Sequence, residues 1–343
     1  MKISNFELYW IDFENYKKIL YEKKININIY QTPEWLKIIS STKNLDIKFL
    51  VVKNKSKVIS ITPFTKKKFL FLNFFGCPLS GTFSLYNGII LNGSYSEEQL
   101  SVLIRVQTEF LKKFTNYTEY IFDERLKDNF QINNVFKKLQ FRLYLYNSFL
   151  LDLGIDKNIL WRNMEGRARN TIRKAKKNNI NIRFDEPDRD WMINFYDMLK
   201  NTFRKSSRLP PHSLNFYLNL IKLPKDKIRF VSALKDQNIL SKAIFLIDDN
   251  KIIYFSGTSN QLGYKLSANA YLLWEVISNN NIEKIKYFDF GGAGNQAIDK
   301  FKQSFGGKNI SYYRWVKCNF FLEKMIMFVK YLSKKGILKT NVV

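Results

Sequence analysis

The order of apolar and polar positions predicts strands and helices in alternation along the chain. Three runs of β-branched and aromatic residues, each bounded by Lys, Asn or Gly, occupy residues 47–52, 57–64 and 68–75. Runs so closely spaced are typical of an antiparallel meander, and three lysines, residues 66–68, fit an exposed hairpin turn within it. Thr32 and Pro33 suit the start of a helix before the meander. A longer helix is predicted after it, at residues 96–114.

The same order of elements recurs from residue 156 onward. A basic helix is followed by a strand at 180–184, a helix at 191–203, strands at 228–234, 241–248 and 251–257, and a helix at 268–279. This recurrence predicts an α/β (mixed α+β) chain of two similar lobes, each a mostly antiparallel mixed sheet flanked by helices. We expect an N-terminal lobe at 1–150, a C-terminal lobe at 151–318 and a basic amphipathic tail at 319–343. A cleft between lobes is a common place for a ligand.

A glycine-rich stretch, IKYFDFGGAGNQAIDKFKQSFGG, closes the second lobe. Residues 285–290 read as a buried strand, which Gly291 and Gly292 end. The helix predicted at 296–305 would be capped by Asn295 or Asp299. An acid, Asp289, therefore stands at a strand end, with Lys302 on the following helix. Strand-end loops often carry active sites, and a purely structural turn is the equal alternative.

The composition limits the chemistry that the chain can perform. The chain has 343 residues, 45% of them hydrophobic, which suffices for two folded lobes. Its net charge of +26 favours anionic partners such as nucleic acid, phosphorylated substrates or an acidic membrane. With only two cysteines and one histidine, the chain is not expected to contain a disulfide framework, a metal site or a Ser-His-Asp triad. Without a signal-peptide pattern or an apolar run of ~20 residues, we expect a cytoplasmic protein.

The segment WRNMEGRARNTIRKAKKNNINIR, which starts at Trp161, forms the basic helix. An apolar stripe follows helical spacing at Met164, Ala168, Ile172 and Ala175. Arg169 and Arg173 fall on the neighbouring face, where bound phosphates would relieve the repulsion between like charges. A solvated helix surface is the competing interpretation of this pattern.

Four segments together resemble the FemAB family of non-ribosomal peptidyltransferases. They are IYQTPEW near the N-terminus, RARNTIRKAKKNNI, YFSGTSNQLGYKLSANAYLLWEVI, and FDFGG followed by DKFKQSFGG. The resemblance covers roughly residues 25 to 315 and implies two lobes with the GNAT acetyltransferase fold. FDFGG plus FK is its most specific part. Family members extend peptidoglycan side chains with aminoacyl-tRNA as the donor. The long helical arm of some members is missing here, and the loop between Gly292 and Phe301 is short.

The resemblance and the residue patterns described above together give the candidate site residues. Phe301 and Lys302 lie at the donor end, with Lys302 placed to stabilise the oxyanion and contact the tRNA terminus. Asp289 is a candidate base, although holding the glycine turn is its more natural role. Further donor- and substrate-binding candidates are Lys37, Arg169, Arg173, Tyr254, Tyr264, Lys265, Asn269, Gly291 and Gly292. For Asn269, a helix-start role is the alternative.

The function expected from the sequence is therefore an aminoacyltransferase that forms an amide on a peptidoglycan or surface-glycan precursor. Aminoacyl-tRNA would be the co-substrate, no cofactor or metal is expected, and the acceptor would be nucleotide- or lipid-linked. An acyl-CoA-dependent N-acyltransferase acting on an amino sugar is the alternative enzyme. An RNA-binding or membrane-surface module without catalysis is the third class. The tail at 319–343 would either contact an anionic membrane at its inner face or pack onto the second lobe.

Overall fold

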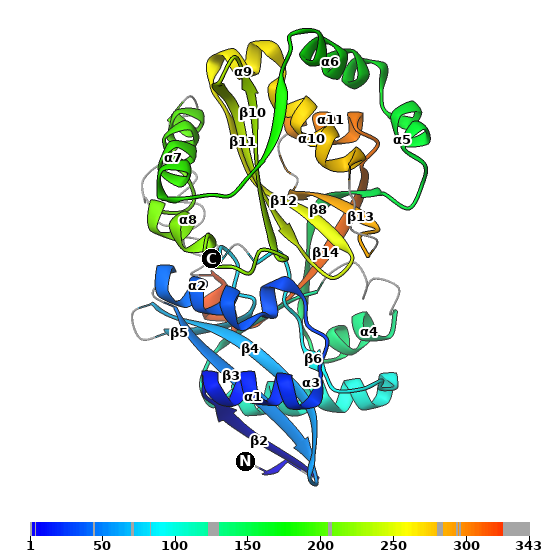
Figure 1. Cartoon of the computed structure of the whole chain (residues 1–343). Helices are drawn as coiled ribbons and strands as arrows, with labels where there is room; N and C mark the ends of the chain where they lie inside the picture. Colours follow the sequence, from blue (N-terminus) through cyan, green and yellow to red (C-terminus); the bar gives the residue numbers. More distant parts are fainter. Residues whose placement is uncertain are drawn as a thin grey trace. The chain divides into compact units, whose positions relative to one another are not determined.

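The computed structural model describes residues 2–3, 5–43, 45–69, 72–82, 84–122, 130–204, 208–279, 284–292, 294 and 296–324. The chain forms two compact units. The first comprises the described residues of Met1–Tyr146 and Ser311–Val343, and the second is Asn147–Ile310. Figure 1 labels their helices and strands. No helix within the described ranges is long and apolar enough to cross a membrane.

The first unit is a mixed sheet with helices on both faces. Its elements are β1 (Lys2–Ile3), β2 (Phe6–Ile11), α1 (Phe13–Lys23), η1 (Ile29–Gln31), α2 (Pro33–Lys43), β3 (Asp46–Asn54), β4 (Lys57–Phe69), β5 (Leu72–Cys77), β6 (Ile90–Leu91), α3 (Glu97–Leu111), β7 (Tyr117–Phe122) and α4 (Phe130–Lys138). Strands β2 to β5 pair antiparallel in order, and β5 then pairs parallel with β7.

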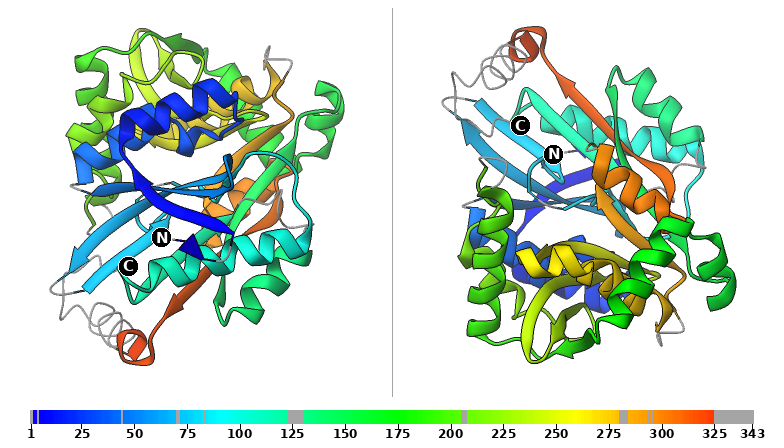
Figure 2. Two further views of the ribbon diagram at one scale, coloured as in Figure 1. Left: turned by 90° about the horizontal axis from the view of Figure 1, so that it is seen from below. Right: turned by 90° about the horizontal axis from the view of Figure 1, so that it is seen from above.

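Alternation along β3 explains how this sheet holds two cores. Phe49 and Val51 pack with Tyr16 and Leu20 of α1 and with Leu36 of α2. Their neighbours in sequence, Leu50 and Val52, point the other way and pack with apolar residues of α3 and α4. Successive side chains of a strand face opposite sides, so one run of apolar residues serves both layers. In the left view of Figure 2, α1 and α3 lie on opposite sides of the strands.

The second unit repeats this architecture. Its elements are α5 (Lys157–Asn163), α6 (Gly166–Lys177), β9 (Asn181–Asp185), α7 (Arg189–Arg204), α8 (Leu214–Leu220), β10 (Ile228–Lys235), β11 (Asn238–Ile247), β12 (Lys251–Ser259), α9 (Gln261–Leu266), α10 (Ala268–Ser278), β13 (Tyr287–Gly292) and α11 (Gln296–Ser304). Strands β9 to β12 pair antiparallel in order, and β12 pairs parallel with β13. Apolar residues of α5, α6, α10 and α11 share a core with the sheet.

Two long strands pass from one unit to the other. Strand β8 (Arg142–Asp152) follows α4, yet its later part pairs with β13 of the second unit, Leu150 opposite Asp289. Strand β14 (Lys308–Cys318) follows α11, yet its later part pairs with β7 of the first unit, Trp315 opposite Tyr120. Each half of the chain thus gives its last strand to the other half's sheet.

Three features differ from the sequence prediction. Lys66, Lys67 and Lys68 do not form a hairpin turn: they lie within β4, which continues to Phe69 because it pairs with β5. The basic segment is two helices, since Met164 and Glu165 take extended backbone angles between α5 and α6. The expected second lobe ran to residue 318, whereas residues 311–318 lie in the first unit because they pair with β7.

Candidate functional site

The parallel pair β12 and β13 forms the candidate site of the second unit. The two strands pair from Lys251 opposite Tyr287 to Ile253 opposite Asp289. Beyond that point β12 pairs only with β11 among the described strands, and a bulge at Tyr254–Ser256 shifts its register. In α/β sheets, ligands bind beyond the carboxyl ends of parallel strands. A ligand bound there would therefore contact the side chains that follow Ile253 and Asp289.

Asp289 holds the glycine turn at the end of β13. Its carboxylate is fully buried. One oxygen accepts hydrogen bonds from Ser148 Oγ at 2.6 Å and from the backbone N–H of Gly291 at 2.8 Å. Gly291 has φ +71°, and a Cβ there would lie 3.0 Å from the carbonyl oxygen of Tyr254. A glycine is required because a side chain would combine a left-handed backbone with this close approach.

Lys302 points into the same turn from α11. Only 6% of the residue is exposed. Its Nζ donates to the carbonyl oxygen of Gly291 at 2.6 Å and also to that of Gly292. Burial lowers the pKa of Lys302, while the nearby Asp289 and Asp299 act in the opposite direction. An ammonium group has three donors, so one remains, among the described contacts, for a group bound beside the turn.

Tyr254 and Asn269 are also brought together. Tyr254 Oη donates to Asn269 Oδ1 at 3.4 Å, and burial raises the pKa of Tyr254 to about 12. The phenol is thus a neutral hydrogen-bond donor at ordinary pH. Its oxygen lies 1.9 Å from the position of a Cβ on Gly257. Gly257, which the sequence analysis did not single out, leaves the space for this phenol.

Hydroxyl groups line the face of β12 that packs against α7 and α8. Thr258 Oγ1 lies 2.8 Å from Thr202 Oγ1, and Ser256 Oγ lies 3.5 Å from Tyr217 Oη. The predicted residue Tyr264, which is half exposed, has its Oη 3.4 Å from Thr202 Oγ1. Sequence analysis missed the other hydroxyls. They could have been found from the polar run SGTS, residues 256–259, which ends an otherwise apolar strand.

The two arginines predicted on the basic helix have different surroundings. The guanidinium of Arg169 donates to the carbonyl of Arg162 at 2.9 Å and to that of Met164, so it caps the end of α5. Arg173 is exposed, lies 5.4 Å from the Trp161 ring and donates to Asn170 at 2.9 Å. The apolar stripe predicted for this segment is confirmed, because its four residues are buried.

The remaining predicted residues are placed as follows. Phe301 packs on the core, with its ring 5.1 Å from that of Phe305. The side chain of Lys265 is exposed, and its carbonyl accepts from Lys174 Nζ at 3.3 Å. Lys37 is exposed on α2 of the first unit. The structure therefore gathers Asp289, Gly291, Gly292 and Lys302 at one turn, with Tyr254 and Asn269 as a second pair. Asn295 lies outside the described residues.

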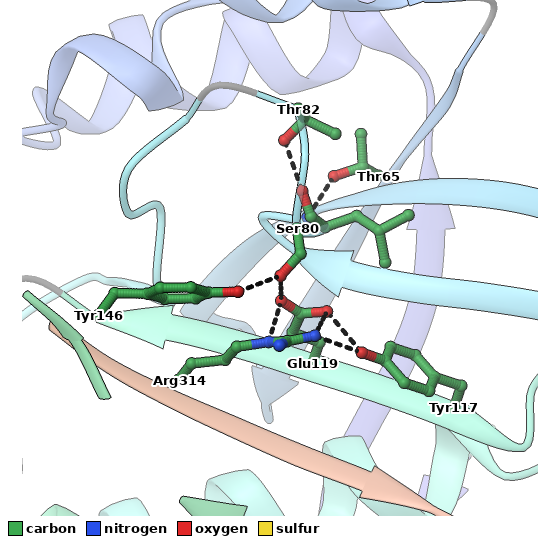
Figure 3. A network of polar contacts seen from close by, with 8 residues as sticks. Thr65, Ser80, Thr82, Tyr117, Glu119, Tyr146 and Arg314 are labelled. Carbon is green, nitrogen blue, oxygen red and sulfur yellow. Dashed lines mark hydrogen bonds and ion pairs between the residues drawn. The ribbon is translucent and has the colours of Figure 1, made fainter. Parts of the chain in front are cut away.

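The first unit has a counterpart of Asp289 on β7. Glu119 follows Tyr117 by two residues, as Asp289 follows Tyr287, and each acid stands in a parallel strand pair. Glu119 is fully buried and pairs with Arg314 at 2.7 Å. Figure 3 shows Tyr117, Ser80 and Tyr146 completing this network, with Tyr117 Oη 2.8 Å from the carboxylate and Ser80 Oγ donating to it. The acid that anchors a turn in one unit is thus half of an ion pair in the other.

Comparisons with known proteins agree with this architecture. Residues 162–303 match the acetyltransferase (GNAT) domain model. The crystal structure of FemX has a TM-score of 0.70 at 13% identity, over 90% of this chain and 96% of that one. L-PGS from Bacillus licheniformis has a TM-score of 0.56 at 12% identity, over 94% and 96%. A tandem GNAT protein from the clavulanic acid biosynthesis pathway has a TM-score of 0.50 at 8% identity, over 90% and 98%. A search of the curated proteins found no matching sequence.

The fold and the matched domain define the class of this chain. It is an acyltransferase of the GNAT fold, and the whole matched domain, residues 162–303, lies within the second unit. Its likeness to FemX extends over both units, so the FemAB-like fold expected from the sequence is confirmed. The expected α/β class with GNAT-like halves is confirmed as well.

Proposed function

We propose that this acyltransferase moves an amino acid from aminoacyl-tRNA to an amine of a peptidoglycan or surface-glycan precursor. The observation that carries the proposal is the position of Lys302. Its buried ammonium is fixed by the carbonyls of Gly291 and Gly292 at the end of a parallel strand pair. A cation held this way needs no rearrangement to stabilise negative charge on a bound ester.

The proposed reaction forms one bond and breaks another. A neutral acceptor amine attacks the ester carbonyl, the carbonyl oxygen becomes an oxyanion beside Lys302, and the bond to the tRNA ribose then breaks. The amine proton leaves with the ribose oxygen. An amine has a pKa near 10.4 and must lose a proton before attack. With Asp289 committed to the turn, we assign that proton transfer to the substrate's own groups.

Two effects would supply most of the rate. Holding the amine and the ester in line is worth on the order of 7–11 kcal/mol at best. A fixed donor aimed at the oxyanion contributes roughly 3 kcal/mol. Tyr254 and Asn269, with Gly257 giving them room, would shape the wall beside the reacting groups.

The donor class is supported by charge and by resemblance. Helix α6 exposes Arg167, Arg173, Lys174, Lys176 and Lys177, and the chain as a whole carries +26. Such a face suits the phosphates of tRNA. The FemAB-like motifs and the FemX-like fold point to the same donor. Lys37 is our candidate for an acceptor phosphate. A lipid-linked acceptor would bring the enzyme to the inner membrane face, where the exposed Phe320 and Phe321 could insert.

The test is transfer of radiolabelled amino acid from a mixed aminoacyl-tRNA pool to a cell-wall precursor. We expect Lys302→Ala to lower kcat by ~100-fold or more. Lys300→Ala is the matched control, because Lys300 lies on the same helix and is exposed. A normal rate for Lys302→Ala, or equal losses in both variants, would contradict the oxyanion role. Hydrogen exchange of α11 would verify that both variants keep the helix.

The second candidate is an acyl-CoA-dependent N-acyltransferase acting on an amino sugar. The match of residues 162–303 to an acetyltransferase domain favours it. Release of CoA thiol, measured with a thiol reagent in the presence of an amino sugar, would support this donor. Lack of any thiol release, together with transfer from tRNA, would eliminate it. A binding module without catalysis predicts activity in neither assay.

A further inference from the structure

A second chemically distinctive lysine lies away from the glycine turn, in the middle of β11. Lys242 is 1% exposed. Its Nζ donates to the carbonyl oxygen of Trp191 at 3.0 Å and lies 4.3 Å from the centre of the Trp191 ring. Within the described part of the chain, no carboxylate forms an ion pair with it at 4 Å or less. Nothing in the proposed transfer reaction uses this amine.

Asp185 is the carboxylate that would be expected to neutralise Lys242, but it accepts hydrogen bonds from other side chains instead. Trp191 Nε1 donates to it at 2.9 Å, and Ser232 Oγ and the guanidinium of Arg183 donate as well. Lys242 therefore keeps a buried ammonium with a ring face and one carbonyl as its contacts. Burial lowers the pKa of Lys242 to about 8, with Asp185 acting in the opposite direction.

Lys242 also lines a cavity of about 540 Å³. This volume lies within the range of small-molecule sites. Its walls combine the Trp191 ring and apolar side chains with a rim of carboxylates, and its lining residues include Phe184, Glu186, Asp188, Asp190, Asn194 and Ile239. A primary amine that loses its proton more readily than an ordinary lysine thus lines a space that can admit a small organic molecule.

We propose that this cavity is a carbonyl site, at which the Lys242 amine forms an imine with a small uncharged aldehyde. The nitrogen lone pair forms a bond to the aldehyde carbon. The carbonyl oxygen takes up two protons, one from the amine nitrogen and one from solvent, its bond to carbon breaks and it leaves as water, so no oxidant or reductant is needed. The product is an iminium cation, which carries the same charge as the ammonium that it replaces.

The surroundings select this class of carbonyl compound. An iminium keeps a positive charge over the Trp191 ring, whereas an acylated lysine would be neutral and would lose the cation–π contact. Glu186 is paired with Lys225 at 2.7 Å, and Arg183, which also lines the cavity, is paired with Asp185. The exposed carboxylates of Asp188 and Asp190 remain to oppose the entry of anions such as phosphorylated aldehydes. The ligand class is therefore an aldehyde without negative charge, such as an open-chain sugar.

The experiment uses the folded wild-type chain, glyceraldehyde as the probe and cyanoborohydride to trap imines. Modification of each lysine is followed by mass spectrometry of peptides over time. At pH 7 we expect Lys242 to react at least ~10-fold faster than the exposed Lys300, because a larger fraction of its amine is neutral. The rate at Lys242 should level off above pH 8. Glyceraldehyde 3-phosphate should react more slowly there, and Asp190→Asn should narrow that difference.

Three results would overturn the proposal. The first is a rate at Lys242 no greater than that at Lys300 in the folded chain. The second is modification of Lys242 only after unfolding in urea. The third is equal reaction with the neutral and the phosphorylated aldehyde. All three results are measured on the wild-type chain, so none of them depends on whether a variant folds.

Discussion

The ion pair between Glu119 and Arg314 offers a direct test of how the first unit is held together. Glu119 is 0% exposed and Arg314 6%, and two nitrogens of the guanidinium donate to the carboxylate at 2.7 and 3.2 Å. Glu119→Gln keeps the shape but removes the negative charge. Arg314 then stays buried without a counterion, so the first unit should lose about 3–5 kcal/mol of stability.

Because two units need not unfold together, we would measure this loss by amide hydrogen exchange rather than by one global transition. Peptides from β7 and β14 report on the first unit, and peptides from β10 and β11 report on the second. The free energy of opening should fall in the first set and stay nearly unchanged in the second. The double variant Glu119→Gln/Arg314→Gln should lose less than the sum of the single variants.

The matched control is an ion pair of the same length on the surface. Lys112 Nζ lies 2.7 Å from Glu109, with both side chains about half exposed. Glu109→Gln should change stability by less than ~1 kcal/mol. If Glu119→Gln costs no more than this control, burial does not set the strength of the pair and our reasoning fails. A loss confined to the second unit's peptides would contradict it equally.

Four further outcomes are expected. Gly291→Ala should destabilise the second unit by about 1–2 kcal/mol because of its positive φ, measured by hydrogen exchange of β13; no change would contradict the turn described here. Gly257→Ala should displace the phenol of Tyr254, lower kcat and destabilise the second unit; adding Tyr254→Leu, which removes the phenol atoms nearest the new Cβ, should restore part of that stability, and no recovery would refute the steric cause. Arg169→Ala should lower the stability of the second unit by about 1 kcal/mol, because its hydrogen bonds to α5 are lost. The affinity for tRNA should stay unchanged, whereas it would fall if Arg169 contacted a phosphate. The pKa of Lys242 is about 8 in the folded chain, so between pH 8 and 10.5 the unfolded chain binds more protons at this residue. The stability of the wild type should therefore rise relative to that of Lys242→Met as the pH rises through this range. If the two proteins differ in urea midpoint by the same amount at pH 7 and at pH 10, the prediction is disproved.

Local patterns in the sequence were sufficient to predict most elements. The meander runs, the apolar stripe of α6 and the glycine turn depend on residues close in sequence, where spacing and backbone preference decide the structure. The break between α5 and α6 was missed because the backbone of Glu165 is set by a long-range bond, from its N–H to the carbonyl of Ser304. No periodic pattern contains that information.

The candidate site could be predicted only in part, for the same reason. Asp289, Gly291 and Lys302 lie within a short stretch, so the sequence alone was enough to predict that they lie close together. Ser148, which hydrogen-bonds Asp289, is 141 residues away. The exchange of β8 and β14 was equally hidden, since an apolar strand does not specify which sheet edge it joins.

That exchange of strands also determines the order in which the chain can fold as it is synthesised. Glu119 and its partner Arg314 are 195 residues apart. At translation rates of about 5–20 residues per second, β7 waits roughly 10–40 s for β14 to emerge. The second unit is continuous, from Asn147 to Ile310, so all of it leaves the ribosome before the first unit's sheet is complete. The part of the chain made first is therefore finished last, and its unpaired strand edge needs protection during that interval.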